Sequence, residues 1–439
     1  MNKRLVAAMI GTALAASVVM AGCGGNSSSG SDSGSSSETT KKEETVDGKE
    51  KSDGEETVLN FYYWDEGQKD GMDAMIKLFE ESHDNITVET TIVPWSEYWT
   101  KLQTSLPNGT GPDVFWMNLY AQPYYDSGLL YDMTDKIESD GVDMSKFPEG
   151  VVSAYIKDGH YFGIPKDYDG TAIFYNKEIF DEMNVDYPEE GWNWDEFKQI
   201  AKELTNDDHY GYASRASSTN YRSFILSNGG RFTTDDLTQA CYNEPEAVEA
   251  YQFLHDLMYV DKVSPTASEM VEVDPSDMFK TGMVAMVPDG SWMMGSYAEA
   301  LGDKLGVMEM PQNVQKGCAT SGLAYCMAAN GSNIDAAWEF CKFAATKEAQ
   351  DATATAVIPA HADSAQAWLD IFSDYPDAHY LIDCVKYAVS NPVYANGKTS
   401  ECETIDADAV NEAWMDENAD IQEIMDRSVE SINAVIAEE

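Results

Sequence analysis

The chain has 439 residues, a length that corresponds to about two or three domains with a substantial core. Its 28 Lys and Arg residues stand against 77 Asp and Glu residues, and the formal net charge of −49 excludes nucleic acid as a partner because a polyanion would be repelled. A hydrophobic content of 43% and an aromatic content of 11% exclude a disordered chain.

The N-terminus has the zones of an export signal. Lys3 and Arg4 precede a mostly apolar run, Leu5 to Met20, which is too short for a permanent membrane span. We therefore expect residues 1–22 to be a signal peptide.

A Ser/Gly-rich stretch follows Cys23, becomes charged, and continues to Glu56 without hydrophobic periodicity. We expect residues 23–56 to be a flexible linker. Small residues before Cys23 and a linker after it resemble a bacterial lipoprotein signal, although Met20 replaces the usual Leu. The resemblance implies that Cys23 is lipid-modified and anchors the protein to the membrane. An ordinary secreted protein with an incidental cysteine is the alternative.

Secondary structure alternates in the first part of the body. Apolar patterns predict a strand at 58–63, a helix through 72–79, a strand at 86–92, a helix through 99–106 and a strand at 114–117. This β-α-β-α-β order is typical of a mostly parallel sheet with helices on its faces. Such sheets bind ligands beyond the carboxyl ends of their strands, which predicts a site near Trp64 and near Trp116 to Asn118.

A second α/β stretch begins after Gly163-Ile164-Pro165. The pattern predicts a strand at 171–175 and a helix that starts at Asn193, where Glu196 completes a capping box. Further helices are predicted at about 245–260 and 334–346.

Six cysteines remain after Cys23, and none forms a C-x-x-C spacing. An even count permits disulfides in an exported protein, but we expect mostly free thiols because Cys341 lies in a helical apolar pattern. The six are Cys241, Cys318, Cys326, Cys341, Cys384 and Cys402.

Motifs of catalysis and metal binding are missing from the sequence. The six histidines form no H-E-x-x-H pair, there is no G-x-S-x-G elbow, and Pro392 occupies the first glycine of an apparent phosphate loop ending at Gly397-Lys398-Thr399. We expect no catalytic residue, no metal and no cofactor. Paired carboxylates are too common among 77 acids to support or exclude a glycoside hydrolase.

Several aromatic residues stand beside polar residues at predicted strand ends or in loops. A sugar needs this mixture, because its C–H faces stack on aromatic rings while its hydroxyls need fixed donors and acceptors. The clusters are Trp64-Asp65-Glu66, Trp116-Met117-Asn118, Tyr168-Asp169 and Asp289-Gly290-Ser291-Trp292.

In the order and spacing of its segments the chain resembles the extracellular solute-binding proteins of ABC importers, of the maltose-binding and sugar-binding lipoprotein type. The resemblance covers the chain from Val58 onward. It is carried by Phe79–His83, Tyr98–Leu102, Gly111–Trp116, Gly163–Pro165, Phe174–Lys177, Trp194–Phe197, Gly290–Trp292 and Ala336–Phe340.

The resemblance implies an α/β fold of two lobes, each a mostly parallel sheet flanked by helices, with the ligand cleft between them. Lobe one is assigned to 57–166 and 321–360, and lobe two to 167–320 and 361–439. A ligand that contacts both lobes favours their closure. The resemblance further implies a monomeric receptor, not an enzyme, on the outer face of the cell membrane, which delivers its ligand to the permease.

The resemblance also implies site residues. Trp116, Trp292, Asp169 and Asn118 match cleft positions of relatives, whereas Leu119 replaces a hydroxyl-binding Asp of the maltose type, which argues against maltose. Trp64 and Asp65 follow from the strand-end rule, and Tyr221 and Tyr394 only from their region. Packing in the core is the alternative for every aromatic residue. The predicted ligand-binding set is Trp64, Asp65, Trp116, Asn118, Tyr168, Asp169, Tyr221, Ser291, Trp292 and Tyr394.

The acidic net charge and the four Arg residues after the signal favour a neutral mono- or oligosaccharide over an acidic one. A polyamine or a peptide is the alternative ligand for the same receptor. A lipid-anchored glycan hydrolase and a surface adhesin are the alternative functions.

Overall fold

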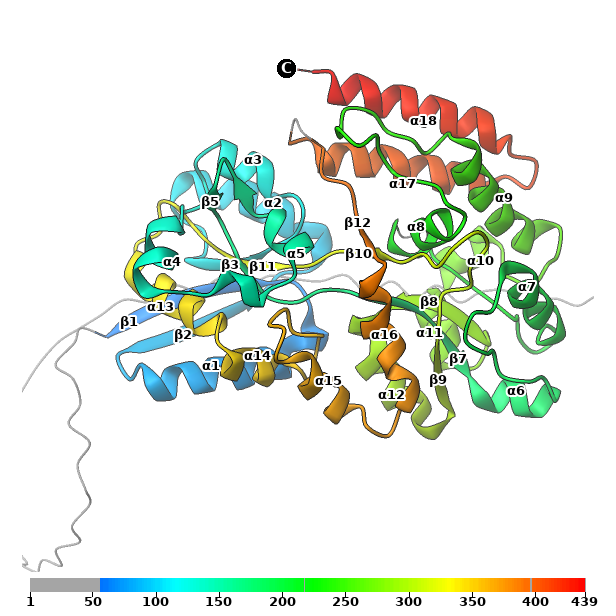
Figure 1. Ribbon diagram of the computed structural model, residues 1–439, viewed down its shortest axis with the longest axis horizontal. Helices are drawn as coiled ribbons and strands as arrows, with labels where there is room; N and C mark the ends of the chain where they lie inside the picture. Colours follow the sequence, from blue (N-terminus) through cyan, green and yellow to red (C-terminus); the bar gives the residue numbers. More distant parts are fainter. Residues whose placement is uncertain (1–55, 217, 395–396, 439) are drawn as a thin grey trace, which may run out of the picture. The chain divides into compact units, whose positions relative to one another are not determined.

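The structure is a computed structural model that describes residues 56–216, 218–394 and 397–438 (Figure 1). The predicted signal peptide, the predicted lipidation site Cys23 and all of the predicted linker except Glu56 lie outside the described residues. Among the residues that are described, no helix has both the length and the apolar run needed to cross a bilayer. The six cysteines after Cys23 are buried free thiols.

The first sheet has five strands in the order β2-β1-β3-β11-β6. β1 runs parallel to β2, with Thr57 opposite Ile86, and parallel to β3; β11 runs antiparallel to β3 and β6. The strands are β1 (Thr57–Tyr63), β2 (Ile86–Ile92), β3 (Val114–Met117), β6 (Ile164–Pro165) and β11 (Ala324–Met327).

Helices cover both faces of this sheet, and the alternating side chains of each strand pack against them in two separate cores. Phe61, Val114 and Trp116 share one hydrophobic core with Phe79 of α1 and Phe340 of α13. The helices around this sheet are α1 (Lys69–Ser82), α2 (Trp95–Ser105), α3 (Ala121–Asp126), α4 (Thr134–Asp140), α5 (Glu149–Ser153), α13 (Ile334–Ala344) and α14 (Lys347–Thr353). A small hairpin joins β4 (Ile156–Lys157) and β5 (His160–Tyr161).

The second sheet has three strands in the order β8-β7-β9, which are β7 (Thr171–Asn176), β8 (Met286–Gly290) and β9 (Leu305–Glu309). Both outer strands run antiparallel to β7, so the expected mostly parallel sheet is wrong here. The long helical excursion after β7 returns to the end where β7 finished, because Met286 at the start of β8 pairs with Tyr175. The alternation of strands and helices in the sequence does not predict that β8 runs antiparallel to β7.

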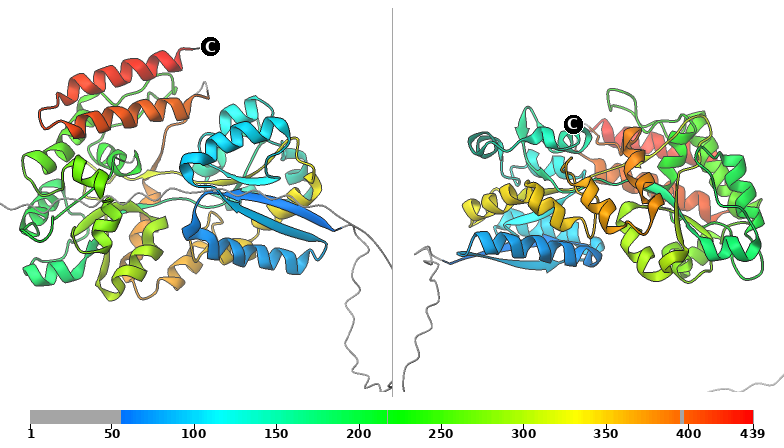
Figure 2. Two further views of the ribbon diagram at one scale, coloured as in Figure 1. Left: turned by 180° about the vertical axis from the view of Figure 1, so that it is seen from behind. Right: turned by 60° about the horizontal axis from the view of Figure 1, so that its bottom comes forward.

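Helices pack around the second sheet, and α18 lies against α17 and α9 (Figure 2). α7 begins with the predicted capping box, in which the Asn193 side chain accepts from the backbone of Glu196 and Glu196 accepts from the backbone of Asn193. The helices are α6 (Lys177–Met183), α7 (Trp194–Glu203), α8 (Ser218–Ser227), α9 (Pro245–Tyr259), α10 (Ala267–Glu272), α11 (Pro275–Lys280), α12 (Met294–Leu301), α17 (Thr399–Met415) and α18 (Ile421–Ile436).

The chain passes between the two sheets more than once. It leaves the first sheet after β6 and enters the second at β7, and it returns between β9 and β11. A third passage leads from α14 through α15 (Ala365–Ile371) and α16 (Tyr380–Asp383) to α17. In these passages β10 (Ala319–Thr320) pairs in parallel with β12 (Val389–Ser390). The exact lobe boundaries stay a prediction.

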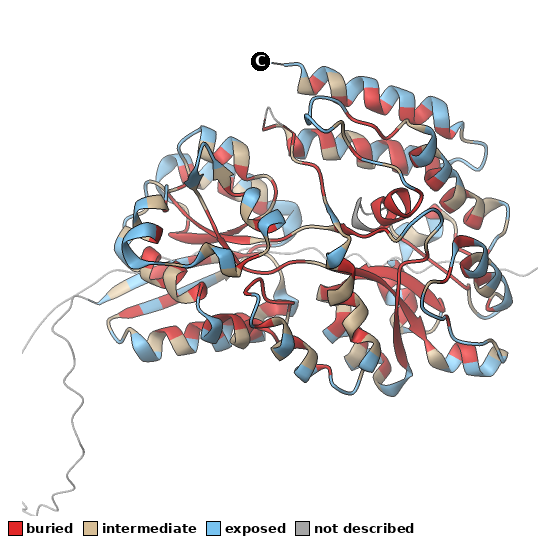
Figure 3. Cartoon of the chain, in the orientation of Figure 1, coloured by how far each residue is buried: buried red, intermediate tan, exposed pale blue. Residues whose placement is uncertain are grey.

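Buried residues concentrate on the strands of both sheets (Figure 3). Every residue of strands β3, β7, β8, β9 and β11 is buried. These strands therefore form the core of the protein. Polar and aromatic side chains that line a cavity lie in segments that follow the strands.

Candidate functional site

A cavity of about 580 Å³ lies where the segments after β1 and β3 meet the inter-sheet passages and the second sheet. This volume is within the range of small-molecule sites. We call it the cleft. Its lining residues are Trp64, Asp65, Gln68, Trp95, Asn118, Leu119 and Tyr120 beside the first sheet, Arg215, Trp292 and Glu403 beside the second, and Asp167, Asp169, Ser321, Leu323 and Asn391 from the passages.

One wall of the cleft is aromatic. The Trp64 ring meets the Trp95 ring nearly edge to face, with centroids 5.2 Å apart and an angle of 76°. Trp95 in turn meets Trp99 at 5.1 Å and 87°. Trp95 begins α2 directly after Pro94, and 46% of its surface is exposed, which is unusual for so large an apolar side chain. The wall therefore offers an open indole face that its neighbours hold in place.

Trp292 lines the cleft from the other sheet, in the short helix η4 (Ser291–Met293) that follows β8. With Trp292 in this orientation there is no room for a side chain on Gly290, because its Cβ would lie 1.9 Å from Cζ3 of the Trp292 ring and the ring would have to move. The glycine lets the indole fold back over the backbone at the end of β8. This explains locally why Gly290 precedes Ser291 and Trp292.

Two polar side chains beside the aromatic wall are held by hydrogen bonds from residues two or three positions later in the chain. Asp65 caps helix η1 (Glu66–Gln68), accepting hydrogen bonds from the Gly67 amide at 2.8 Å and from Gln68 Nε2 at 2.9 Å. Asn118 Oδ1 accepts from the Tyr120 amide at 2.9 Å, which leaves its amide nitrogen as a donor. Such fixed groups can meet sugar hydroxyls without a further ordering cost.

Two carboxylates lie on the floor of the cleft. Asp167 is buried against the buried ammonium group of Lys166, and it accepts from the Leu323 amide at 2.9 Å. Asp169 accepts from Ser321 Oγ at 2.9 Å. Burial, followed by the nearby charge of Asp167, raises the pKa of Asp169 to about 7. Asp169 can therefore act as a donor or an acceptor close to neutral pH.

The raised pKa of Asp169 makes the stability of the protein depend on pH. The unfolded carboxyl loses its proton near its usual value of 3.8, whereas the folded one keeps it to about 7, so the folded state binds more protons between these values. The free energy of unfolding should thus fall as the pH rises from about 4 to about 7. Replacing Asp169→Asn removes this loss and should stabilise the protein on the order of a few kcal/mol more at pH 8 than at pH 5.

Thermal unfolding of the wild type and D169N at both pH values checks this expectation. Asp186→Asn is the control, because Asp186 is an exposed acid outside the cleft. An equal difference between D169N and the wild type at pH 5 and pH 8 would contradict the raised pKa.

The basic group of the cleft is already compensated. Arg215 Nη2 donates to Asp289 Oδ2 at 3.0 Å and lies 3.5 Å from Asp274 Oδ1. Tyr297 OH donates to the same oxygen of Asp289 at 2.8 Å. The guanidinium is therefore oriented by carboxylates, and it does not stand as a free anion-binding charge.

Five of the ten predicted site residues line the cleft, namely Trp64, Asp65, Asn118, Asp169 and Trp292. Tyr168, Tyr221, Ser291 and Tyr394 are buried outside its lining. The hydroxyl of Tyr221 donates to Asp406 Oδ2 at 2.6 Å. Ser291 lies next to Trp292, yet its own side chain is buried.

Trp116 also departs from the expectation, since it is fully buried in the core of the first lobe. Side-chain alternation points Trp116 to the same face as Val114, toward α1 and α13. Lys166 Nζ lies 4.1 Å from the centre of its ring and covers it. The Trp64 ring, 5.2 Å away, takes the position beside the cleft.

Replacing Trp116→Ala should lower the free energy of unfolding by about 3–5 kcal/mol, because it leaves a large cavity and uncovers the buried Lys166. Urea unfolding followed by circular dichroism measures this loss. If W116A has unchanged stability but no longer binds ligand, Trp116 contacts the ligand and is not a core residue.

The sequence did not predict the other ten lining residues, among them Trp95, Tyr120, Arg215, Asn391 and Glu403. Trp95 carried a usable signal, because it stands three positions after the end of the predicted strand at 86–92. Glu403 carried none, since it is one acid among 77.

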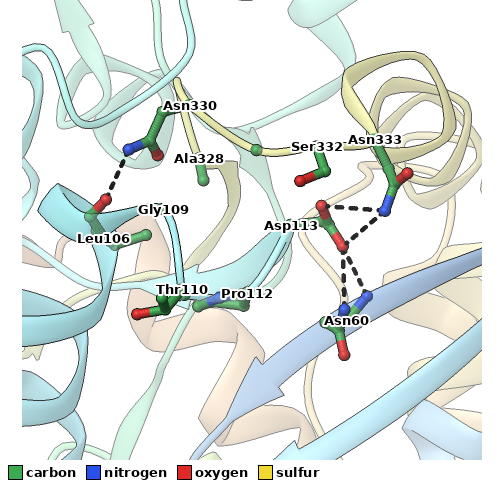
Figure 4. Close-up of a pocket in the computed structure, with 12 residues that line it drawn as sticks. Asn60, Leu106, Gly109, Thr110, Pro112, Asp113, Ala328, Asn330, Ser332 and Asn333 are labelled. Carbon is green, nitrogen blue, oxygen red and sulfur yellow. Dashed lines mark hydrogen bonds between the residues drawn. The ribbon is translucent and has the colours of Figure 1, made fainter.

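A second, smaller pocket of about 250 Å³ lies at the start of β3 (Figure 4). Its carboxylate, Asp113, accepts from the Asn60 amide at 2.9 Å and from Asn333 Nδ2 at 3.4 Å. Asp113 thus ties β1 to the loop before α13. The described residues contain no group of three or more His, Cys, Asp or Glu side chains placed to hold a metal ion.

Comparison with known proteins identifies relatives of this arrangement. Residues 74–379 match the family described as bacterial extracellular solute-binding proteins. The chain is 26% identical over 254 residues to a maltotriose-binding protein of Pyrococcus abyssi, covering 56% of this chain and 53% of that protein. It is 28% identical over 248 residues to an arabinooligosaccharide-binding protein of Halalkalibacterium halodurans, covering 54% of each. The chain thus spans about half the length of these curated relatives.

Solved structures extend the likeness to nearly the whole described chain. An ABC substrate-binding protein of Listeria monocytogenes in complex with cycloalternan aligns with a TM-score of 0.81 at 25% identity, covering 88% of this chain and 100% of that one. A solute-binding protein of Thermotoga lettingae bound with α-D-tagatose aligns with a TM-score of 0.77 at 20% identity, covering 87% and 100%. The predicted two-lobed α/β fold is confirmed.

Proposed function

Because the chain belongs to the family of bacterial extracellular solute-binding proteins, we propose that it is the receptor of an ABC importer and captures a neutral oligosaccharide in the cleft. The observation that carries this proposal is the lining of the cleft. Trp64 and Trp95 from one lobe and Trp292 from the other combine with Asp65, Asn118 and Asp169. Indole faces can stack on sugar rings while the polar groups bond hydroxyls.

The charges of the cleft support a neutral ligand. Asp167 is paired with Lys166, and Arg215 is paired with Asp289. An anionic sugar would find no uncompensated base among the described lining residues, and the net charge of −49 would oppose its approach. The curated relatives named for maltotriose and arabinooligosaccharide support a sugar of several units as the ligand.

The location and partners follow from the same proposal. Export by residues 1–22 and lipid attachment at Cys23 would hold the receptor on the outer face of the membrane, within reach of the permease subunits. The protein would act as a monomer without cofactor. It would bind and release the sugar unchanged, without catalysis.

A ligand screen tests this function. Thermal unfolding of residues 57–439 is measured with maltotriose, arabinotriose, galactotriose, spermidine and a tripeptide, and each sugar is analysed by mass spectrometry after incubation. We expect a raised Tm with one class of oligosaccharide and no new products. Stabilisation by spermidine or the tripeptide alone would replace the sugar, and release of shorter sugars would establish a hydrolase instead.

A further inference from the structure

A hydrogen bond links the two lobes at the rim of the cleft. Tyr120, in the segment after β3, donates its hydroxyl hydrogen to Glu403 Oε2 at 2.8 Å. Glu403 lies in the second turn of α17, and Ser400, one turn earlier, also bonds the Tyr120 hydroxyl. Tyr120 belongs to the first lobe, whereas α17 packs on α18 and α9 of the second.

The acceptor is fixed from behind by a buried arginine. Arg222 is fully buried, and its Nη1 donates to Glu403 Oε1 at 3.0 Å. The same guanidinium donates to Asp406 Oδ2 at 3.0 Å and to Asn391 Oδ1 at 3.1 Å. Of the two oxygens of Glu403, one is held by Arg222 and the other faces Tyr120. A buried, charge-assisted arrangement of this kind leaves the carboxylate little freedom.

The donor is fixed as well. The Tyr120 ring meets the Trp99 ring at 4.9 Å and 64°, and its amide is bonded to Asn118. Close by, Gly397 adopts a left-handed φ of 75°, and a Cβ there would lie 3.4 Å from the Gln122 side chain of α3. The chain before α17 therefore approaches α3 closely beside the hydrogen bond.

From this geometry we infer that Tyr120 and Glu403 form a latch that stabilises the closed lobes before any ligand arrives. The two residues lie on different lobes, so their hydrogen bond exists only when the lobes are together. The free energy of the hydrogen bond shifts the equilibrium between the open and closed states toward the closed state. The apparent affinity for the ligand rises with the population of the closed state. Arg222 is a positioning residue, because it acts by aiming Glu403. The affinity effect rests on the proposed function, whereas the closure effect does not.

Small-angle X-ray scattering of the ligand-free protein tests the latch without any ligand. Tyr120→Phe removes only the hydroxyl and should increase the radius of gyration. Tyr187→Phe is the matched control, because the Tyr187 hydroxyl also donates to a carboxylate, Asp181 Oδ1 at 2.7 Å, within one lobe. The radius of gyration of Y187F should equal that of the wild type.

A double-mutant cycle shows whether Tyr120 acts through Glu403. Glu403→Ala removes the acceptor and should open the protein as Y120F does, and adding Y120F to E403A should change the radius of gyration little further. Calorimetry with maltotriose supplies a second readout, in which Y120F should weaken binding about tenfold.

The outcomes separate the latch from the proposed function. An unchanged radius of gyration in ligand-free Y120F would overturn the latch even if maltotriose binds the wild type. An increase in Y120F but not in Y187F would support it even if no sugar binds. Fully additive effects of Y120F and E403A would refute the pairing of these two residues.

Discussion

Replacing Trp95→Ala should weaken binding of the sugar about 30-fold or more. A tryptophan that stacks on a ligand at the centre of a site contributes roughly 2 kcal/mol or more to binding, and Trp95 presents an open indole face to the cleft. The free energy of unfolding should change by less than about 1 kcal/mol, because 46% of the residue is already exposed. Calorimetric titration and urea unfolding measure the two effects.

Ile371→Ala is the control for Trp95. Ile371 has the same 46% exposure, but it lies on α15 outside the cleft, so its replacement should leave sugar affinity unchanged. If W95A and I371A bind the sugar equally well, Trp95 is an exposed surface residue without a role in recognition.

Replacing Trp292→Ala should weaken binding of the sugar about 100-fold. Trp292 is the aromatic residue that the second lobe contributes to the cleft, so its loss removes both a stacking surface and part of the reason for the lobes to close on the sugar. Trp292→Phe keeps a smaller aromatic face and should recover part of the affinity. The measurement is again calorimetry, with circular dichroism to confirm that both variants are folded.

Affinity in W292A equal to that of the wild type would remove Trp292 from the site. A loss that W292F does not recover at all, in folded protein, would indicate that the indole N–H and not the ring face makes the essential contact.

The sequence predicted those parts of the fold that depend on neighbouring residues. Strand β1, helix α7 with its Asn193 and Glu196 cap, and helix α13 follow from local periodicity and capping. The direction of β8 did not, because it depends on where the chain returns after more than a hundred residues.

The site divides in the same way. Trp64, Asn118 and Trp292 line the cleft; the strand-end rule predicted Trp64, and the family resemblance matched Asn118 and Trp292 to cleft positions. Their role in ligand binding stays a prediction. Trp116, which the family resemblance matched to a cleft position, lies in the core, because a one-residue step along β3 changes the face on which a side chain lies. The position of a residue near the end of a predicted strand does not show on which face of the sheet its side chain lies.

Contacts between distant segments were beyond any local pattern. Arg222 and Asp406 are 184 residues apart, and Tyr120 and Glu403 are 283 apart. Their pairing depends on how the third passage of the chain brings α17 back to the cleft. In a chain with 77 acids, the partner of a given base or hydroxyl is decided by this topology alone.

We expect a neutral oligosaccharide to bind between the lobes, on Trp95 and Trp292. Its most direct test is a calorimetric titration of residues 57–439, wild type and W95A/W292A, with the sugar that raises the Tm most. We predict one site of micromolar or tighter Kd in the wild type and no measurable heat in the folded double variant. Equal binding by both proteins, or heat from spermidine and from no sugar, would contradict sugar binding on these two tryptophans.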